Sequence, residues 1–93
     1  MSLRKIFFRE YELDLEETLK SGKAAELNIE TAKKLVECLK NKGYFCVVLY
    51  EGERKMLRKV MVGWYGGMNG DNDFYKIVES FGLKYNPVEP SSL

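Results

Sequence analysis

The most restrictive feature of the sequence is a pair of helical apolar stripes that flank two strand-like segments. The first stripe begins after Asn28, a helix-capping residue, and ends at Gly43, and the second ends at Gly82. The first consists of Ile29, Ala32, Leu35, Val36 and Leu39, and the second of Phe74, Ile77, Val78 and Phe81. A helix that is apolar along one stripe must pack that stripe against another layer. The two stripes therefore predict two helices on a common sheet.

Four segments have the composition of strands. Residues 3–11 mix aromatic and β-branched side chains with charges, and residues 44–50 form a nearly continuous apolar run. A glycine turn separates that run from residues 56–65, which predicts a hairpin, and residues 83–85 add a short final strand. Between the first strand and the first long helix, Asp14 and Glu17 form a capping box, which predicts a short helix ending near Ser21.

The order of these elements predicts an α+β fold. We expect a two-layer sandwich of the β-α-β-β-α(-β) ferredoxin-like type, with an antiparallel sheet and both main helices on one face. A chain of 93 residues has room for a single core. We expect one domain over residues 1–88, and a flexible C-terminal tail over 89–93 after Asn86-Pro87.

The composition disfavours several classes of function. The sequence has no histidine, which removes the usual proton shuttle and the commonest nitrogen ligand for metals. No pair of chemically reactive side chains has a recognised motif spacing, so we expect no enzyme, no metal and no cofactor. The formal net charge is +1, and Cys38 and Cys46 fit neither a zinc site nor a disulfide framework. No apolar run is long enough for a membrane span or a signal peptide, which predicts a cytoplasmic protein.

One sheet face is expected to stay open, because both helices cover the other. In the first strand, Ile6 and Phe8 are predicted to face the core, and the alternate residues to face outward. In the hairpin, Phe45, Val47, Leu49, Val60 and Val62 are predicted to point inward. The predicted open face then carries Lys5, Phe7, Arg9, Tyr11, Tyr44, Cys46, Val48, Tyr50, Lys59, Met61 and Tyr65. A register shift of one residue would reverse any of these assignments.

Such an aromatic and basic face has three interpretations. The first is a contact surface for another protein or for a second copy of the chain, as in a homodimer. The second is single-stranded RNA or DNA binding, with bases stacked on the rings and phosphates held by Lys5, Arg9 and Lys59. The third is purely structural, with the rings half-buried by the short helix or the tail. We expect a protein partner or self-association, with nucleic acid as the alternative.

Two further groups of residues are candidates for binding. Trp64 stands at the entrance of the glycine-rich stretch 63–70, where it is either an interface anchor or a lid over the core edge. Asp71 and Asp73 argue against an anion site there, and are expected to cap the following helix. On the hairpin, Arg54, Lys55 and Arg58 form a basic cluster, which is either a solvated edge that opposes aggregation or an arm that contacts phosphates.

Overall fold

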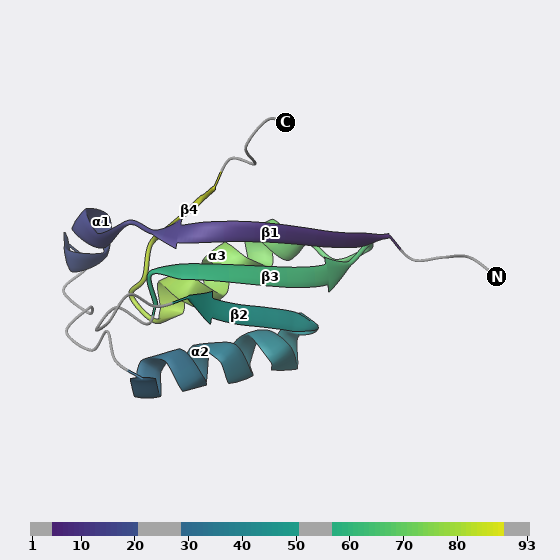
Figure 1. Ribbon diagram of the computed structural model, residues 1–93, viewed down its shortest axis with the longest axis horizontal. Helices are drawn as coiled ribbons and strands as arrows, with labels where there is room; N and C mark the ends of the chain where they lie inside the picture. The colour runs from purple at the N-terminus through teal and green to yellow at the C-terminus, as the bar shows by residue number, and fades with distance from the viewer. Residues whose placement is uncertain (1–4, 21–28, 51–56, 89–93) are drawn as a thin grey trace.

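The computed structural model describes residues 5–20, 29–50 and 57–88, and the side chain of Tyr50 is outside this description. Its elements are β1 (Ile6–Leu13), α1 (Leu15–Lys20), α2 (Ile29–Lys42), β2 (Cys46–Tyr50), β3 (Lys59–Tyr65), α3 (Gly70–Ser80) and β4 (Tyr85–Pro87) (Figure 1). The predicted α+β class is confirmed. β1 begins later than expected and extends to Leu13, whereas β4 begins at the last residue of the predicted final strand.

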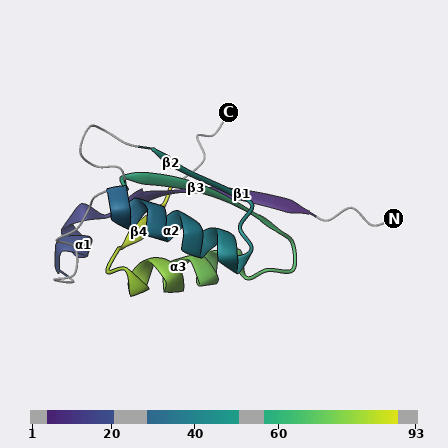
Figure 2. The ribbon, with the colours of Figure 1, turned by 90° about the horizontal axis from the view of Figure 1, so that it is seen from below.

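The strands form an antiparallel sheet in the order β2-β3-β1-β4. Seen from the side in Figure 2, α2 and α3 lie on the same side of this sheet, which is compatible with a two-layer sandwich. The central pair, β1 and β3, places Phe8 opposite Gly63, and β2 places Cys46 opposite the same glycine. None of the described helices covers the other side of the sheet, which we call the open face.

The central residues of both predicted stripes are buried, whereas Ile29 is 50% exposed and Val36, Ile77 and Phe81 are half-buried. Ala32, Leu35 and Leu39 of α2 are buried, as are Phe74 and Val78 of α3. The two helices end as the sequence predicted, because Gly43 and Gly82 have φ angles of 114° and 76° that favour glycine.

Three helix caps were predicted: Asn28 lies outside the described residues, and the other two give one confirmation and one correction. Asp14 Oδ1 accepts a hydrogen bond from the Glu17 backbone N–H at 3.1 Å, so the predicted cap of α1 is confirmed. In α3, Asn69 occupies the N-cap position without a side-chain capping bond, and Asp71 and Asp73 lie within the first turn. The prediction that these two aspartates cap α3 is therefore wrong, although acidic groups there complement the helix dipole.

The predicted faces of β1 are reversed. Tyr11 is fully buried, and its ring stacks on Phe74 of α3 with centroids 3.9 Å apart. Phe7 stacks on Trp64, which is itself only 6% exposed, so both rings point toward the helices. Ile6 and Phe8, which were expected in the core, are 52% and 57% exposed on the open face. The reversal follows from the side-chain period of two, since one wrong assignment moves every residue of a strand to the other face.

The start of β2 also differs from the prediction. Val47 and Leu49 pack against the core as expected, whereas Tyr44 is buried and Phe45 is 40% exposed on the open face. The chain bends at Phe45, whose backbone N–H bonds to the Gly63 carbonyl oxygen just before β2 begins. The alternation of faces is therefore interrupted before Cys46, and the two aromatic side chains exchange places.

The two outer strands of the sheet end differently. β2 is an edge strand of five residues, and β4 is an edge strand of three residues that ends in Pro87. The Val88 N–H bonds to the Glu10 carbonyl oxygen, which places residues 86 and 88 in bonding register with β1. By alternation, the missing N–H of Pro87 falls on the outer side, as is usual for proline in edge strands.

Candidate interaction surface

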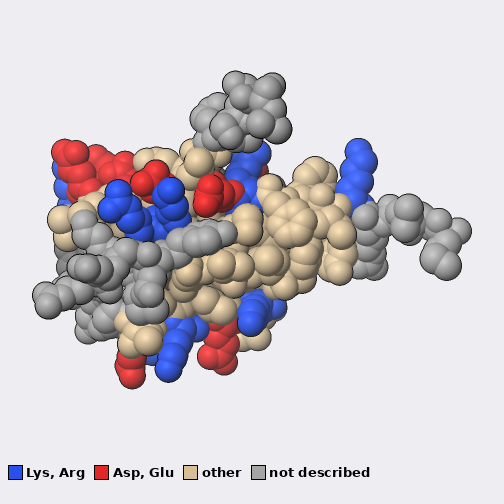
Figure 3. Space-filling model, in the orientation of Figure 1, with Lys and Arg blue, Asp and Glu red and all other residues tan. Residues whose placement is uncertain are grey.

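Exposed apolar side chains gather at one end of the open face. We call this set the open-face patch, and it consists of Ile6, Phe8, Phe45, Cys46, Val48, Met61 and Tyr65. Ile6, Phe8, Phe45, Val48 and Tyr65 are 38–57% exposed. In Figure 3 the patch corresponds to a continuous uncharged area over the end of the sheet where β1 begins and β3 ends. Contiguous apolar surface of this kind usually marks a contact site.

A glycine organises the aromatic rings of the patch. Phe8 and Phe45 meet edge to face with centroids 5.6 Å apart, and Phe45 lies 4.8 Å from the Tyr65 ring. A Cβ atom built on Gly63 would approach Phe45 Cζ and Phe8 Cε1 to 2.9 Å. The two phenylalanine rings therefore lie over the backbone of Gly63, in space that a side chain at this position would fill. The patch is an ordered surface because its rings hold one another in place.

The charged groups of the open face stand at the opposite end of the strands. β1 contributes Glu10 and Glu12 to this face, and β3 contributes Lys59, which lies opposite Glu12 in the register. Arg58 Nε approaches Glu12 Oε1 at 3.8 Å, with both side chains about half exposed. Figure 3 shows acidic and basic side chains mixed at this end of the molecule. The described residues at this end therefore combine Glu10 and Glu12 with Lys59 and Arg58, so acid and base are balanced.

The structure separates most of the predicted binding residues from the open face. Lys5 continues the alternation of Phe7, Arg9 and Tyr11, on the side of the sheet that faces the helices. Phe7 remains 44% exposed, at the end of the sheet beyond its stacking contact with Trp64. The predicted row of alternating cations and rings on the open face is therefore wrong.

The remaining predicted residues are divided among three environments. Lys59 and Tyr65 lie on the open face, as predicted. Tyr44 and Trp64 lie in the core, so the lid interpretation of Trp64 fits its burial. The side chain of Tyr50, and all of Arg54 and Lys55, lie outside the described residues. Arg58 of the predicted basic cluster is exposed and faces Glu12.

On the covered face, Tyr11, Arg9 and Asp71 form a polar cluster between β1 and α3. Tyr11 donates its phenolic hydrogen bond to Asp71 Oδ1, and Arg9 Nε lies 3.6 Å from the same oxygen. Burial, followed by the hydrogen bond to Asp71, raises the pKa of Tyr11 far above its ordinary value, so the phenol stays protonated and keeps donating. This cluster ties the first turn of α3 to β1, and it accounts for Arg9 without a bound phosphate.

Packing around Gly70 also holds the start of α3 against the sheet. A Cβ atom on Gly70 would lie 2.2 Å from Trp64 Cε2, so the Trp64 ring lies directly against the start of α3. Tyr44 meets the Trp64 ring edge to face, and its hydroxyl donates a hydrogen bond to the Gly70 carbonyl oxygen. These aromatic contacts stabilise the covered face, and they leave neither ring available to a partner.

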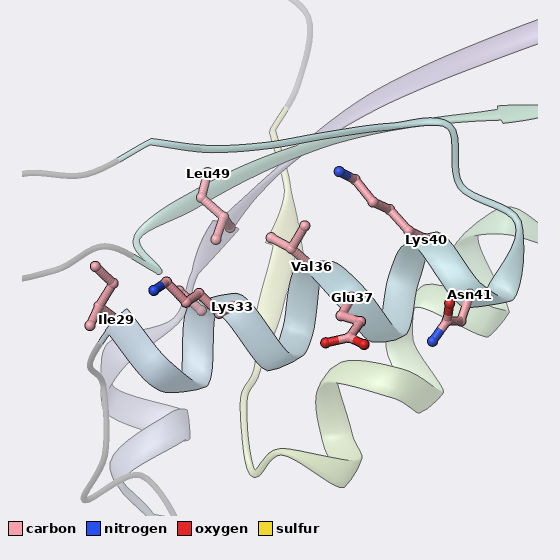
Figure 4. A pocket seen from close by; sticks show the side chains of 8 residues that line it. Ile29, Lys33, Val36, Glu37, Lys40, Asn41 and Leu49 are labelled. Atoms are coloured by element: carbon pink, nitrogen blue, oxygen red, sulfur yellow. The ribbon is translucent and has the colours of Figure 1, made fainter.

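A groove of about 540 Å³ runs between α2 and the outer edge of β2. Its lining includes the apolar side chains of Ile29, Val36 and Leu49, with Lys33 and Lys40 at its rim (Figure 4). Ile29 directly follows residue 28, and Leu49 stands two positions before residue 51, so the end of the groove at these two residues adjoins segments outside the described residues. We assign no partner to this groove.

Two kinds of site concern the side chains and helices of the described parts of the chain: clusters of metal ligands and membrane-spanning helices. These parts contain no group of three or more side chains suited to hold a metal ion. No described helix is long and apolar enough to cross a membrane. In comparisons with known proteins, no protein-family model, no curated protein and no solved structure matched the chain.

Proposed function

We propose that this protein is a small non-catalytic binding module that associates with itself through the open-face patch. The observation that carries the proposal is the cluster of Phe8, Phe45 and Tyr65 over Gly63, exposed on a face that no described helix covers. Aromatic side chains have only two rotatable side-chain bonds, so they lose little conformational entropy in a complex. They are also enriched at protein interfaces.

We further propose that the architecture is the ferredoxin-like sandwich. The order β2-β3-β1-β4, with antiparallel neighbours and two long helices on one face, supports this assignment. The fold matters to function because it leaves one complete sheet face without helices. A face-to-face contact between two such sheets would bury the patches of both copies at once.

The charge distribution favours a protein contact over single-stranded nucleic acid. Nucleic-acid binders combine stacking rings with cations that hold the phosphates. Here Lys5 and Arg9 lie on the other side of the sheet, and Arg9 is engaged with Asp71. On the open face Glu10 and Glu12 are matched by Lys59 and Arg58, so the described residues there offer a phosphate backbone no net positive charge.

Solution sizing across a range of concentrations tests the proposal. Analytical ultracentrifugation should show a monomer–dimer equilibrium that changes little with salt, because apolar contacts are insensitive to ionic screening. Replacing Phe8 and Phe45 together with alanine should raise the dissociation constant by roughly tenfold or more, since central aromatic residues dominate interface energies. Circular dichroism checks that the variant stays folded.

A matched double variant provides the control. Leu19→Ala with Ile29→Ala removes two helix side chains that are 57% and 50% exposed, comparable to Phe8 and Phe45, and should leave the equilibrium unchanged. A wild-type chain that stays monomeric at every concentration would contradict the proposal. Tight binding of a fluorescent single-stranded oligonucleotide, weakening steeply with salt, would support the nucleic-acid alternative instead.

A further inference from the structure

The charges of the open face are distributed between the two central strands in a self-complementary way. Along the β1–β3 pair, Phe8 lies opposite Gly63, Glu10 opposite Met61 and Glu12 opposite Lys59. Both acidic groups therefore belong to β1, and the cation belongs to β3. If β1 of one copy is stacked over β3 of a second copy, the glutamates of each copy can lie over the lysine of the other. The two open-face patches then remain in contact.

A homodimer usually closes through a twofold axis, which for face-to-face sheets lies in the plane of the contact. If the axis runs across the strands, the strands of the second copy run in the opposite direction to those of the first. The charged end of each copy then covers the partner's patch or projects beyond it without a counter-charge. If the axis instead runs along the strands, the aromatic ends stay together and the charged ends stay together.

We infer that two copies of this chain pair with the twofold axis along the strands, between β1 and β3, so that Glu12 faces Lys59 of the partner subunit. This inference rests on the proposed self-association and specifies its geometry. Packed sheets lie about 10 Å apart with strands crossing at about 30°, a gap that glutamate and lysine side chains together can span. By symmetry the contact occurs twice in each dimer.

The two contacts determine orientation more than affinity. Glu12 is about half exposed and lies 3.8 Å from Arg58 Nε of its own chain, so a further contact with Lys59 of the partner subunit adds little stability by itself. A like-charge juxtaposition at the same place is costly, because it opposes a contact that the apolar patch drives. In the reversed arrangement the same charges would lie over the partner's apolar patch without a counter-charge, which is also costly, so Glu12 and Lys59 act as specificity-determining residues that disfavour it.

Charge reversal with mixing tests the orientation. Glu12→Lys alone places two lysines in contact across the interface, and Lys59→Glu alone places two glutamates there. Each variant alone should therefore dimerise about tenfold more weakly than the wild type. An equimolar mixture should form a heterodimer of near wild-type affinity, because both contacts again join opposite charges. Because lysine and glutamate residues have nearly the same mass, one variant is labelled uniformly with ¹⁵N, and native mass spectrometry then identifies the heterodimer by its intermediate mass.

Glu79→Lys and Lys84→Glu provide the matched control. These residues form an ion pair at 2.8 Å at the end of α3, and the two changes give the same net charges as the test variants. Each should dimerise like the wild type, without gain on mixing. The double variant Glu12→Lys with Lys59→Glu restores opposite charges in one chain and should also dimerise normally.

The outcomes separate this inference from the proposed function. If the wild type dimerises through the patch but mixing restores nothing, the orientation is wrong while self-association stands. If the control variants gain as much from mixing as the test variants, net charge explains the result and the orientation is again overturned. A wild-type chain that remains monomeric contradicts both the proposed function and this inference.

Discussion

The two faces of the sheet use aromatic residues from the same strands in opposite ways. On the covered face, Tyr11 and Trp64 pack against side chains and backbone of α3 and are 0% and 6% exposed. On the open face, Phe8 and Tyr65 are 57% and 38% exposed and pack with Phe45 over a glycine. Because both faces carry aromatic residues, aromatic content alone does not identify a contact surface. The helices determine which rings are buried in the fold and which remain exposed to solvent.

The largest expected difference between the faces is in stability. Phe74→Ala should lower the free energy of unfolding by about 3–5 kcal/mol, because it leaves a cavity under Tyr11 in a fully buried site. Phe8→Ala should cost less than about 1 kcal/mol, since the ring is mostly exposed. Urea unfolding followed by circular dichroism measures both. Equal losses would mean that Phe8 belongs to the core and that the two faces do not differ.

A smaller effect is expected where the backbone of α3 meets the Trp64 ring. Gly70→Ala should destabilise the protein by about 1–3 kcal/mol, because the added Cβ would lie 2.2 Å from Trp64 Cε2. Gly66→Ala is the matched control, since its Cβ would find ordinary contacts no closer than 3.4 Å. Thermal unfolding of both variants tests the prediction, which fails if Gly66→Ala is the more damaging change.

Alkaline pH should lower the free energy of unfolding through the buried tyrosines of the covered face. Burial raises the pKa of Tyr85 above its ordinary value of 10.0, and the Tyr85 hydroxyl donates to the Leu57 carbonyl oxygen. Below pH 10 the phenol is protonated in both states, so its contribution to stability is complete. Above pH 10 the unfolded chain releases the proton while the folded chain retains it, so stability falls by up to about 1.4 kcal/mol per pH unit.

The matched variant Tyr85→Phe separates this group from the others. Burial also raises the pKa values of Tyr11 and Tyr44, so the wild type should lose stability steadily above pH 10. Tyr85→Phe should lose less between about pH 9 and pH 11, because one proton-linked group is absent. Urea midpoints at these pH values make the comparison. The prediction is wrong if the two proteins show the same slope.

The smallest effect on stability is expected beneath the open-face patch. Gly63→Ala places a Cβ against the outer atoms of the Phe8 and Phe45 rings, which can move because they are exposed. The free energy of unfolding should change by less than about 1 kcal/mol. Self-association should nevertheless weaken measurably in sedimentation experiments, because the displaced rings no longer present the same surface. Severe destabilisation would show that these rings are anchored in the fold.

The sequence predicted the elements better than the faces. The stripes of α2 and α3, and their glycine ends, depend on spacings within one segment, and both were found in the structure. Which residues of β1 face the helices depends on whether the odd- or the even-numbered positions point inward. Both sets contain aromatic side chains, so residues 3–11 alone could not decide between them. Extending the strand to Leu13 supplies the missing signal, because Glu10 and Glu12 then share one face while Tyr11 and Leu13 share the other.

The open-face patch was harder to predict because part of it follows from a local irregularity. Phe45 reaches the open face through a bend before β2, and periodicity does not reveal where an alternation is interrupted. Gly63 offered a signal, since a glycine inside a strand often marks a place where other groups approach the backbone closely. The long-range pairing of Phe8 with Gly63 became known only from the register of β1 and β3.

The unequal edges of the sheet limit how copies of this chain could add to one another. At β4 the strand is short, and Pro87 removes a donor from its outer side, so a further strand would find an incomplete hydrogen-bonding row. Strand addition along β4 is therefore disfavoured, whereas β2 and the start of β1 keep edges that no described strand pairs. A polymer needs two adhesive ends on every subunit, so a short edge that ends in proline lowers the tendency of the sheet to grow on that side.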